Sequence, residues 1–100
     1  MNIIFIDGDK IHTVEDMYGA IRASLPADAM PGSNLDALFD VLTAVGEPTG
    51  IIVVNTEALR SVPGIKWHVL LRLFEDVTDE NKNVSVLIDP FETDEYIQEI

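Results

Sequence analysis

Several residue types and patterns are scarce or missing in this chain of 100 residues. Cysteine is absent, which excludes a disulfide framework and thiolate chemistry. No apolar run approaches the ~18 residues that a membrane-spanning helix requires. The first residues, MNIIFIDGDK, place no basic leader before the apolar run, so we expect no signal peptide. These absences favour a cytoplasmic protein.

The motifs of common enzyme classes are missing as well. No P-loop, Gly-x-Gly-x-x-Gly fingerprint or Gly-x-Ser-x-Gly elbow occurs in the sequence. His12 and His68 are the only histidines, and neither has a second histidine at the spacing of zinc ligands. We therefore predict no catalytic residues, no metal and no cofactor.

One segment, FIDGDKI, allows two interpretations. Asp7 and Asp9 follow an apolar run, and two carboxylates at the end of a strand can hold Mg²⁺, as in a metal-dependent hydrolase. A tight turn with polar side chains is the alternative. We favour the turn, because Lys10 and Ile11 stand where phosphatases of the haloacid dehalogenase type need a hydroxyl or an acid.

Acidic residues are what the sequence has in excess. Eighteen Asp and Glu face six Lys and Arg, and the net charge is −12. Such a charge repels nucleic acid and anionic membranes, so we expect neither as a partner. It attracts a basic partner, or it serves only solubility. Hydrophobic residues make up 47% of the chain, which fits one buried core.

The hydrophobic pattern predicts an α/β fold with a small three-stranded parallel sheet packed with about four helices. We expect residues 1–89 to form one domain, and residues 90–100 to form an acidic tail packed on it or on a second copy. A last short helix is expected from Thr93. The predicted strands span residues 3–6, 50–54 and 84–88. The predicted helices span residues 14–25, a segment that follows a cap at Ser33 or Asn34 and ends near residues 44–46, residues 56–61 and residues 65–77. Thr13 and Asp16 predict a weak form of the capping box for the first helix. In the last helix we expect Val69 to face inward, Trp67 to be half-buried and His68 to lie on the surface beside it.

The second predicted helix carries an unusual pair of charges. Its apolar residues Leu35, Leu38 and Leu42 recur with the spacing of one helical face. Asp36 and Asp40 stand four residues apart on another face, where like charges repel by a few tenths of a kcal/mol. Helix-dipole stabilisation explains Asp36 in the first turn, but it does not explain Asp40. Asp40 belongs either to an ordinary solvated face or to an acidic ridge whose repulsion a cationic partner relieves.

The run GSNLDALFD, residues 32–40, followed by VLT closely resembles the helix that marks the barstar family, the intracellular inhibitors of barnase-type ribonucleases. Residues 6–11, IDGDKI, also resemble the first strand and turn of that family. The resemblance implies that the two helix aspartates face a basic ribonuclease active site in place of substrate phosphates. It further implies a partner-binding surface made of Met30, Gly32, Asn34, Asp36, Ala37, Phe39, Asp40, Thr43 and Asp76.

The chain departs from the family's pattern near this helix and at its end. Met30 and Pro31 stand where barstars offer two tyrosines, and Val45 stands where they have a contact tryptophan. Residues after Asp89 lie beyond the family's usual end. The partner is thus a relative of barnase or an unrelated nuclease toxin.

The resemblance implies a function without chemistry. We expect an immunity protein, a monomer or weak dimer, that binds and occludes the active site of a basic secreted ribonuclease. The alternative is a small acidic adaptor or regulatory protein that binds a basic partner other than a nuclease.

Overall fold

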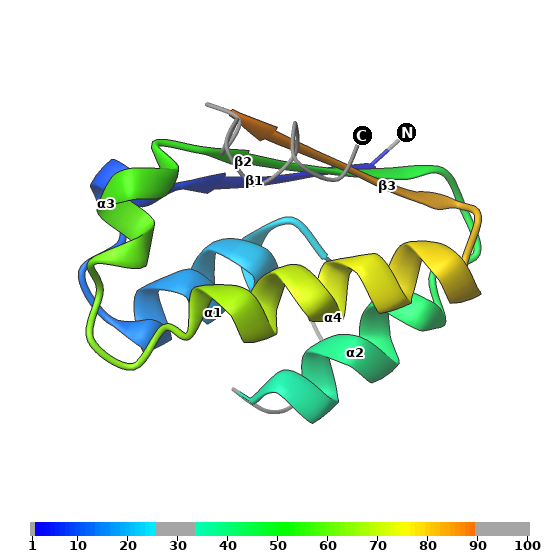
Figure 1. Cartoon of the computed structure of the whole chain (residues 1–100). Coiled ribbons are helices and arrows are strands. Elements are labelled where there is room, and N and C mark those ends of the chain that lie inside the picture. Colours follow the sequence, from blue (N-terminus) through cyan, green and yellow to red (C-terminus); the bar gives the residue numbers. More distant parts are fainter. Residues whose placement is uncertain (1, 26–33, 90–100) are drawn as a thin grey trace.

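The computed structural model describes residues 2–25 and 34–89 of the chain (Figure 1). No helix among these residues is long and apolar enough to cross a membrane. The elements in chain order are β1 (Asn2–Asp7), the 3-10 helix η1 (Gly8–Lys10), α1 (Val14–Ala23), α2 (Leu35–Thr43), β2 (Thr49–Val54), α3 (Thr56–Arg60), α4 (Trp67–Glu80) and β3 (Val84–Asp89).

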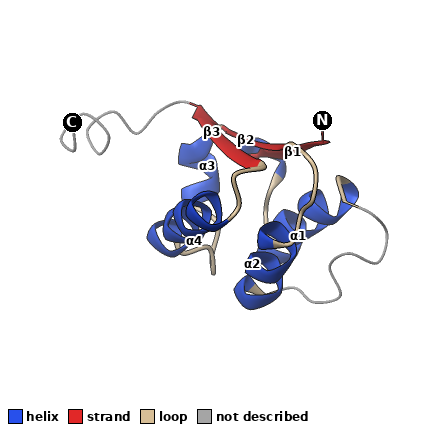
Figure 2. Cartoon of the chain, turned by 90° about the vertical axis from the view of Figure 1, so that its right-hand side faces the viewer, coloured by secondary structure: helices blue, strands red, loops and turns tan. Residues whose placement is uncertain are grey.

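The three strands form one parallel sheet in the order β1-β2-β3. Ile6 of β1 pairs with Val53 of β2, and Val53 pairs with Ile88 of β3. Figures 1 and 2 show α1, α2 and α4 on the same side of the sheet, with α3 near one end of the strands. The sheet therefore has one face covered by helices.

The core lies between this covered face and the helices. Alternate strand residues such as Ile4, Ile51 and Val53 are buried against it, as the two-residue period of a strand requires. From the helical layer, Ile21 and Leu38 are almost fully buried. This packing anchors α2 in the core through Leu38.

The end of β1 is a tight polar turn. The Asp7 carboxylate accepts hydrogen bonds from the Asn55 side chain (2.8 Å) and the Asp9 backbone N–H (3.0 Å). These two bonds hold the pKa of Asp7 below its ordinary value. Gly8 packs so closely that a Cβ there would lie 2.1 Å from the carbonyl oxygen of Asn55. Only glycine fits at position 8, because the backbone that follows β2 lies directly against it.

The predicted fold class is confirmed, and the three strands extend at most one residue beyond the predicted bounds at either end. α4 begins two residues later and ends three residues later than expected. Trp67 was expected to be half-buried, but it is 5% exposed, because it packs into the core at the start of α4. Val69 was expected to face inward, yet it is 44% exposed. The predicted tail helix from Thr93 lies outside the described residues.

Candidate functional site

Helix α2 begins at a side-chain cap. The Asn34 side-chain oxygen accepts a hydrogen bond from the backbone N–H of Ala37 at 2.8 Å. Such a cap satisfies one of the helix's first free N–H groups and fixes where the helix starts. Asp36 therefore falls in the first turn, where the helix dipole favours a carboxylate.

The other end of α2 is held by a buried amide from the end of α4. The Asn81 side chain donates to the carbonyls of Leu42 (3.0 Å), Thr43 (3.2 Å) and Val45 (2.9 Å). Its own oxygen accepts from the Asn83 backbone N–H at 3.0 Å. Asn81 thus satisfies carbonyl groups at the end of α2 and ties that end to α4.

The two aspartates of α2 lie on the solvent-exposed side of the helix. Asp36 and Asp40 are both exposed, and Leu38 and Leu42 between and after them are buried. Within residues 2–25 and 34–89, no lysine or arginine forms an ion pair with either carboxylate. Both charges are therefore available to cations from outside the chain.

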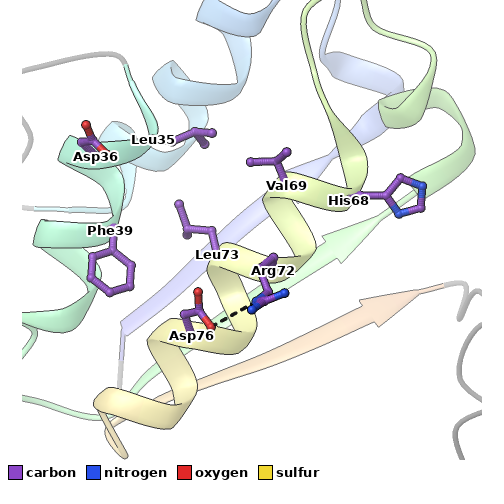
Figure 3. Close-up of a pocket in the computed structure, with 8 residues that line it drawn as sticks. All are labelled: Leu35, Asp36, Phe39, His68, Val69, Arg72, Leu73 and Asp76. Carbon is purple, nitrogen blue, oxygen red and sulfur yellow. Dashed lines mark ion pairs between the residues drawn. The ribbon is translucent and has the colours of Figure 1, made fainter.

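A cleft of about 460 Å³ runs between α2 and α4 (Figure 3). Its walls combine apolar side chains with charged ones. Figure 3 shows Asp36 and Phe39 on α2, across from Leu73 and Asp76 on α4. The lining residues are Leu35, Asp36, Phe39, His68, Val69, Arg72, Leu73 and Asp76.

One acid of the cleft already has a cation beside it. The Arg72 Nε lies 3.5 Å from the Asp76 Oδ1, one turn apart on α4 (Figure 3). Both side chains are more than half exposed, so this pair is weak and solvent-screened. A cationic side chain of a partner that bonds Asp76 more closely can therefore displace Arg72.

A family model described as Barstar (barnase inhibitor) matches residues 1–89. The chain belongs to the barstar family. No curated protein matches the chain.

The remaining predicted residues of the barstar-like surface have different local environments. Ala37 and Phe39 are half-buried, and Phe39 contributes to the cleft. Thr43 is occupied within the helix, because its hydroxyl donates to the carbonyls of Phe39 (2.8 Å) and Asp40 (3.2 Å). Met30 and Gly32 lie outside the described residues.

Sequence reasoning missed part of this surface. It placed His68 on the helix surface beside Trp67, without a link to α2, and it did not assign Arg72 to the site. The available signal was the spacing of residues 69, 72 and 76, which lie on one side of a helix. Asn81 was also missed, because a polar residue after a helix is typical of an ordinary loop.

At the alternative metal site, the Asp7 carboxylate already accepts hydrogen bonds from the chain itself. Both the Asn55 amide and the Asp9 N–H donate to Asp7 Oδ1, as a turn requires. Among the described residues, no three His, Asp or Glu side chains cluster in a way that could hold a metal ion. The geometry fits the turn, and the barstar family's members are inhibitors rather than enzymes.

Proposed function

We propose that this protein is an immunity protein that inhibits a ribonuclease toxin by covering its basic active site. Members of the barstar family bind barnase-type ribonucleases. In this proposal Asp36 and Asp40 occupy the positions of substrate phosphates, and Asp76 supports them from α4. The protein performs no chemistry and acts in the cytoplasm.

The observation that carries the proposal is the exposed pair Asp36 and Asp40, which forms no ion pair within the described chain. Residues four apart on a helix stand about 6 Å from each other. That separation is close to the spacing of successive phosphates along a nucleic-acid backbone. Arginine and lysine of a ribonuclease would relieve the repulsion of the pair through charge-assisted hydrogen bonds.

The positions of these carboxylates are well defined. The Asn34 cap and the Asn81 amide hold the two ends of α2, and Leu38 and Leu42 anchor its middle in the core. A binding group that is already in place loses little conformational entropy when its partner arrives. The net charge of −12 would in addition speed the encounter with a basic protein.

The cleft beside the pair gives the partner a second point of contact. Phe39 and Leu73 line it with apolar surface, and Asp36 and Asp76 add charge. A cationic side chain with a long apolar stem, such as arginine, matches this combination. Val45 replaces the contact tryptophan of other barstars, so the aromatic part of the interface differs and favours a different ribonuclease from barnase itself.

The direct test is inhibition of RNA cleavage by a set of barnase-type ribonucleases, with barnase included. We expect the full chain to inhibit at least one of them at a 1:1 ratio, with an association rate that falls as salt is added. Asp40→Ala should lose most of the inhibition. Glu75→Ala, an exposed acid elsewhere on α4, is the matched control and should retain it.

Two results would contradict the proposal. One is a chain that inhibits none of the enzymes but still captures a basic protein of another class, as the adaptor alternative expects. The other is inhibition that survives equally in Asp36→Ala, Asp40→Ala and the control.

A further inference from the structure

The second face of the sheet is lined by apolar side chains and is not covered by a helix of the described chain. α1, α2 and α4 lie on the opposite side (Figures 1 and 2). Ile3 is 45% exposed, Phe5 is 49% exposed and Leu87 is 51% exposed. Together with the half-buried Ile52 and Val54 they form what we call the open face.

The strand register gathers these residues into a continuous patch. Phe5 pairs with Ile52, and Ile52 pairs with Leu87, so the three side chains form a row across all three strands. Parallel sheets are normally buried on both faces. A contiguous apolar patch on a small protein usually marks a surface that contacts something else.

The sequence supplies an apolar segment next to this patch. Residues 90–100 follow directly on Asp89, the last residue of the edge strand β3. Tyr96, Ile97 and Ile100 have the spacing of one side of a helix. These large apolar residues need a surface to bury them, even though the segment also carries four acids.

The segment is long enough to reach the patch. Leu87 lies two residues before Asp89, and the row ends on β1, two strands away at roughly 4.8 Å per strand. Ile97 lies eight positions after Asp89, which corresponds to about 12 Å along a helix and about 26 Å along an extended chain. We propose that residues 90–100 fold back over the open face and seat Tyr96, Ile97 and Ile100 on the row of Phe5, Ile52 and Leu87.

Charge favours this tethered segment over a second copy of the protein. Two copies would each bring a net charge of −12 to the interface. A segment attached at Asp89 instead has an effective concentration in the millimolar range without any association step. The cover is therefore intramolecular, and it is independent of the binding surface on α2 and α4.

The first test places a nitroxide spin label on the full chain through Gln98→Cys. Gln98 falls on the side of a helix away from Tyr96, Ile97 and Ile100, and the chain has no other cysteine. We expect the label to broaden the NMR signals of Ile3, Phe5 and Leu87. The same label combined with Tyr96→Ser, Ile97→Ser and Ile100→Ser should leave those signals sharp.

A mixed sample identifies which chain supplies the cover. Chains that carry the nitroxide but no ¹⁵N are mixed with ¹⁵N-enriched chains that carry no nitroxide. We expect no broadening of the NMR signals of the open face in this mixture. Broadening in the mixture as strong as in the single labelled chain would make a second copy the occupant and overturn the proposal. Sharp Ile3, Phe5 and Leu87 signals in the labelled native chain would overturn it as well.

A stability measurement provides the second test. Leu87→Thr in the full chain should lower the melting temperature by about 4–8 °C, because it removes apolar surface that the segment covers. Val69→Thr is the control, since Val69 is similarly exposed but lies on α4 in the cleft; it should shift the melting temperature by less than about 2 °C. In the triple-serine variant the effect of Leu87→Thr should disappear, and its persistence would contradict the contact.

Discussion

Two pairs of aspartates in this molecule have opposite environments. Asp7 and Asp16 accept hydrogen bonds from their own chain: Asp16 receives the backbone N–H groups of His12 (2.9 Å) and Thr13 (3.2 Å), and Asp7 receives those described above. Asp36 and Asp40 stand exposed on α2, with no ion pair in the described chain. The first pair serves the fold, and in the proposed function the second pair binds a partner.

The difference shows that charge alone does not reveal the role of an acid. All four residues are aspartates near the surface of a chain with a net charge of −12. What separates them is the number of donors that the fold directs at each carboxylate. A carboxylate with several donors stabilises the protein, whereas one with no donor among residues 2–25 and 34–89 adds repulsion that a cationic partner can remove.

The sharpest test of this comparison is Asp40→Ala. In the proposed complex this variant should lose about 2–5 kcal/mol of binding free energy, mainly through faster dissociation, because the partner's buried cations lose their counter-charge. This range is typical of buried charge pairs, those of the barnase–barstar complex among them. In the free protein the change should be neutral or slightly stabilising, because alanine favours a helix and the repulsion from Asp36 disappears. Binding kinetics and thermal melts measure the two effects.

Acids in the C-terminal segment provide the control for Asp40. Glu95→Gln and Glu99→Gln should lower only the association rate, and added salt should mask the effect. If Asp40→Ala destabilised the free protein by more than about 1 kcal/mol and left binding intact, Asp40 would belong with the structural pair.

The next largest effect is expected where α2 is held to α4. Asn81→Ala removes the side-chain donor from the carbonyls of Leu42, Thr43 and Val45, of which Val45 keeps a second donor in Asn83. It should therefore lower the free energy of unfolding by about 1–3 kcal/mol. Asn83→Ala is the control, because its exposed side chain makes a single 3.3 Å bond to Val45. Urea denaturation of both variants measures the difference, and equal losses would argue against a special role for Asn81.

A smaller effect is expected at the beginning of α2. Asn34→Ala removes the cap on the Ala37 N–H and should cost about 1 kcal/mol of stability. Asn34→Ser keeps an acceptor at the same place and should recover most of the loss. Should the serine variant bind a ribonuclease as well as the native chain does, Asn34 would act by positioning Asp36 and not by direct contact.

The smallest expected effect is a dependence of stability on acid. Hydrogen bonds from His12 and Thr13 lower the pKa of Asp16, and those from Asn55 and Asp9 lower the pKa of Asp7. Because the folded pKa values lie below the ordinary 3.8, their stabilising contribution is complete above that pH and is lost as the pH falls through the folded values. Asp16→Asn should reduce this acid sensitivity in melts between pH 2 and pH 6.

A charge-matched variant separates this effect from that of net charge. Asp36→Asn removes the same charge from α2, so its melting curves serve as the reference for Asp16→Asn. Identical curves for the two variants at every pH would remove the distinction between the two pairs of acids.

Most of the fold could be predicted from the sequence, because short local patterns mark most of its helices and strands. The strand GIIVV is a short β-branched run, and Thr13 with Asp16 predicted a capping box, which the structure contains in full. Both ends of α4 were predicted two or three residues away from their observed positions, and no side chain caps its N-terminus to mark the start. Val69 was wrongly predicted to be buried, because α4 has apolar residues beyond the side that packs into the core.

The candidate site could be predicted only where a local run of sequence marks it. Asp36 and Asp40 lie in the contiguous motif that resembles the barstar family, and both are exposed as expected. Arg72 and Asn81 depend on contacts between segments far apart in the chain: Asn81 reaches Leu42 across the sequence. Neither the spacing of residues nor the composition predicts contacts between such distant segments.

The parallel order of the strands also determines how quickly this protein becomes competent. β1 and β2 are joined through residues 8–48, and β2 and β3 through residues 55–83, so neither pair of neighbouring strands forms a hairpin. Each pairing must close a long loop before any contact repays the entropy, and chains with such non-local contacts fold more slowly than helical bundles of similar size. A newly made chain therefore passes through a delay before α2 is packed in place, and under the proposed function protection of the cell would begin only after that delay.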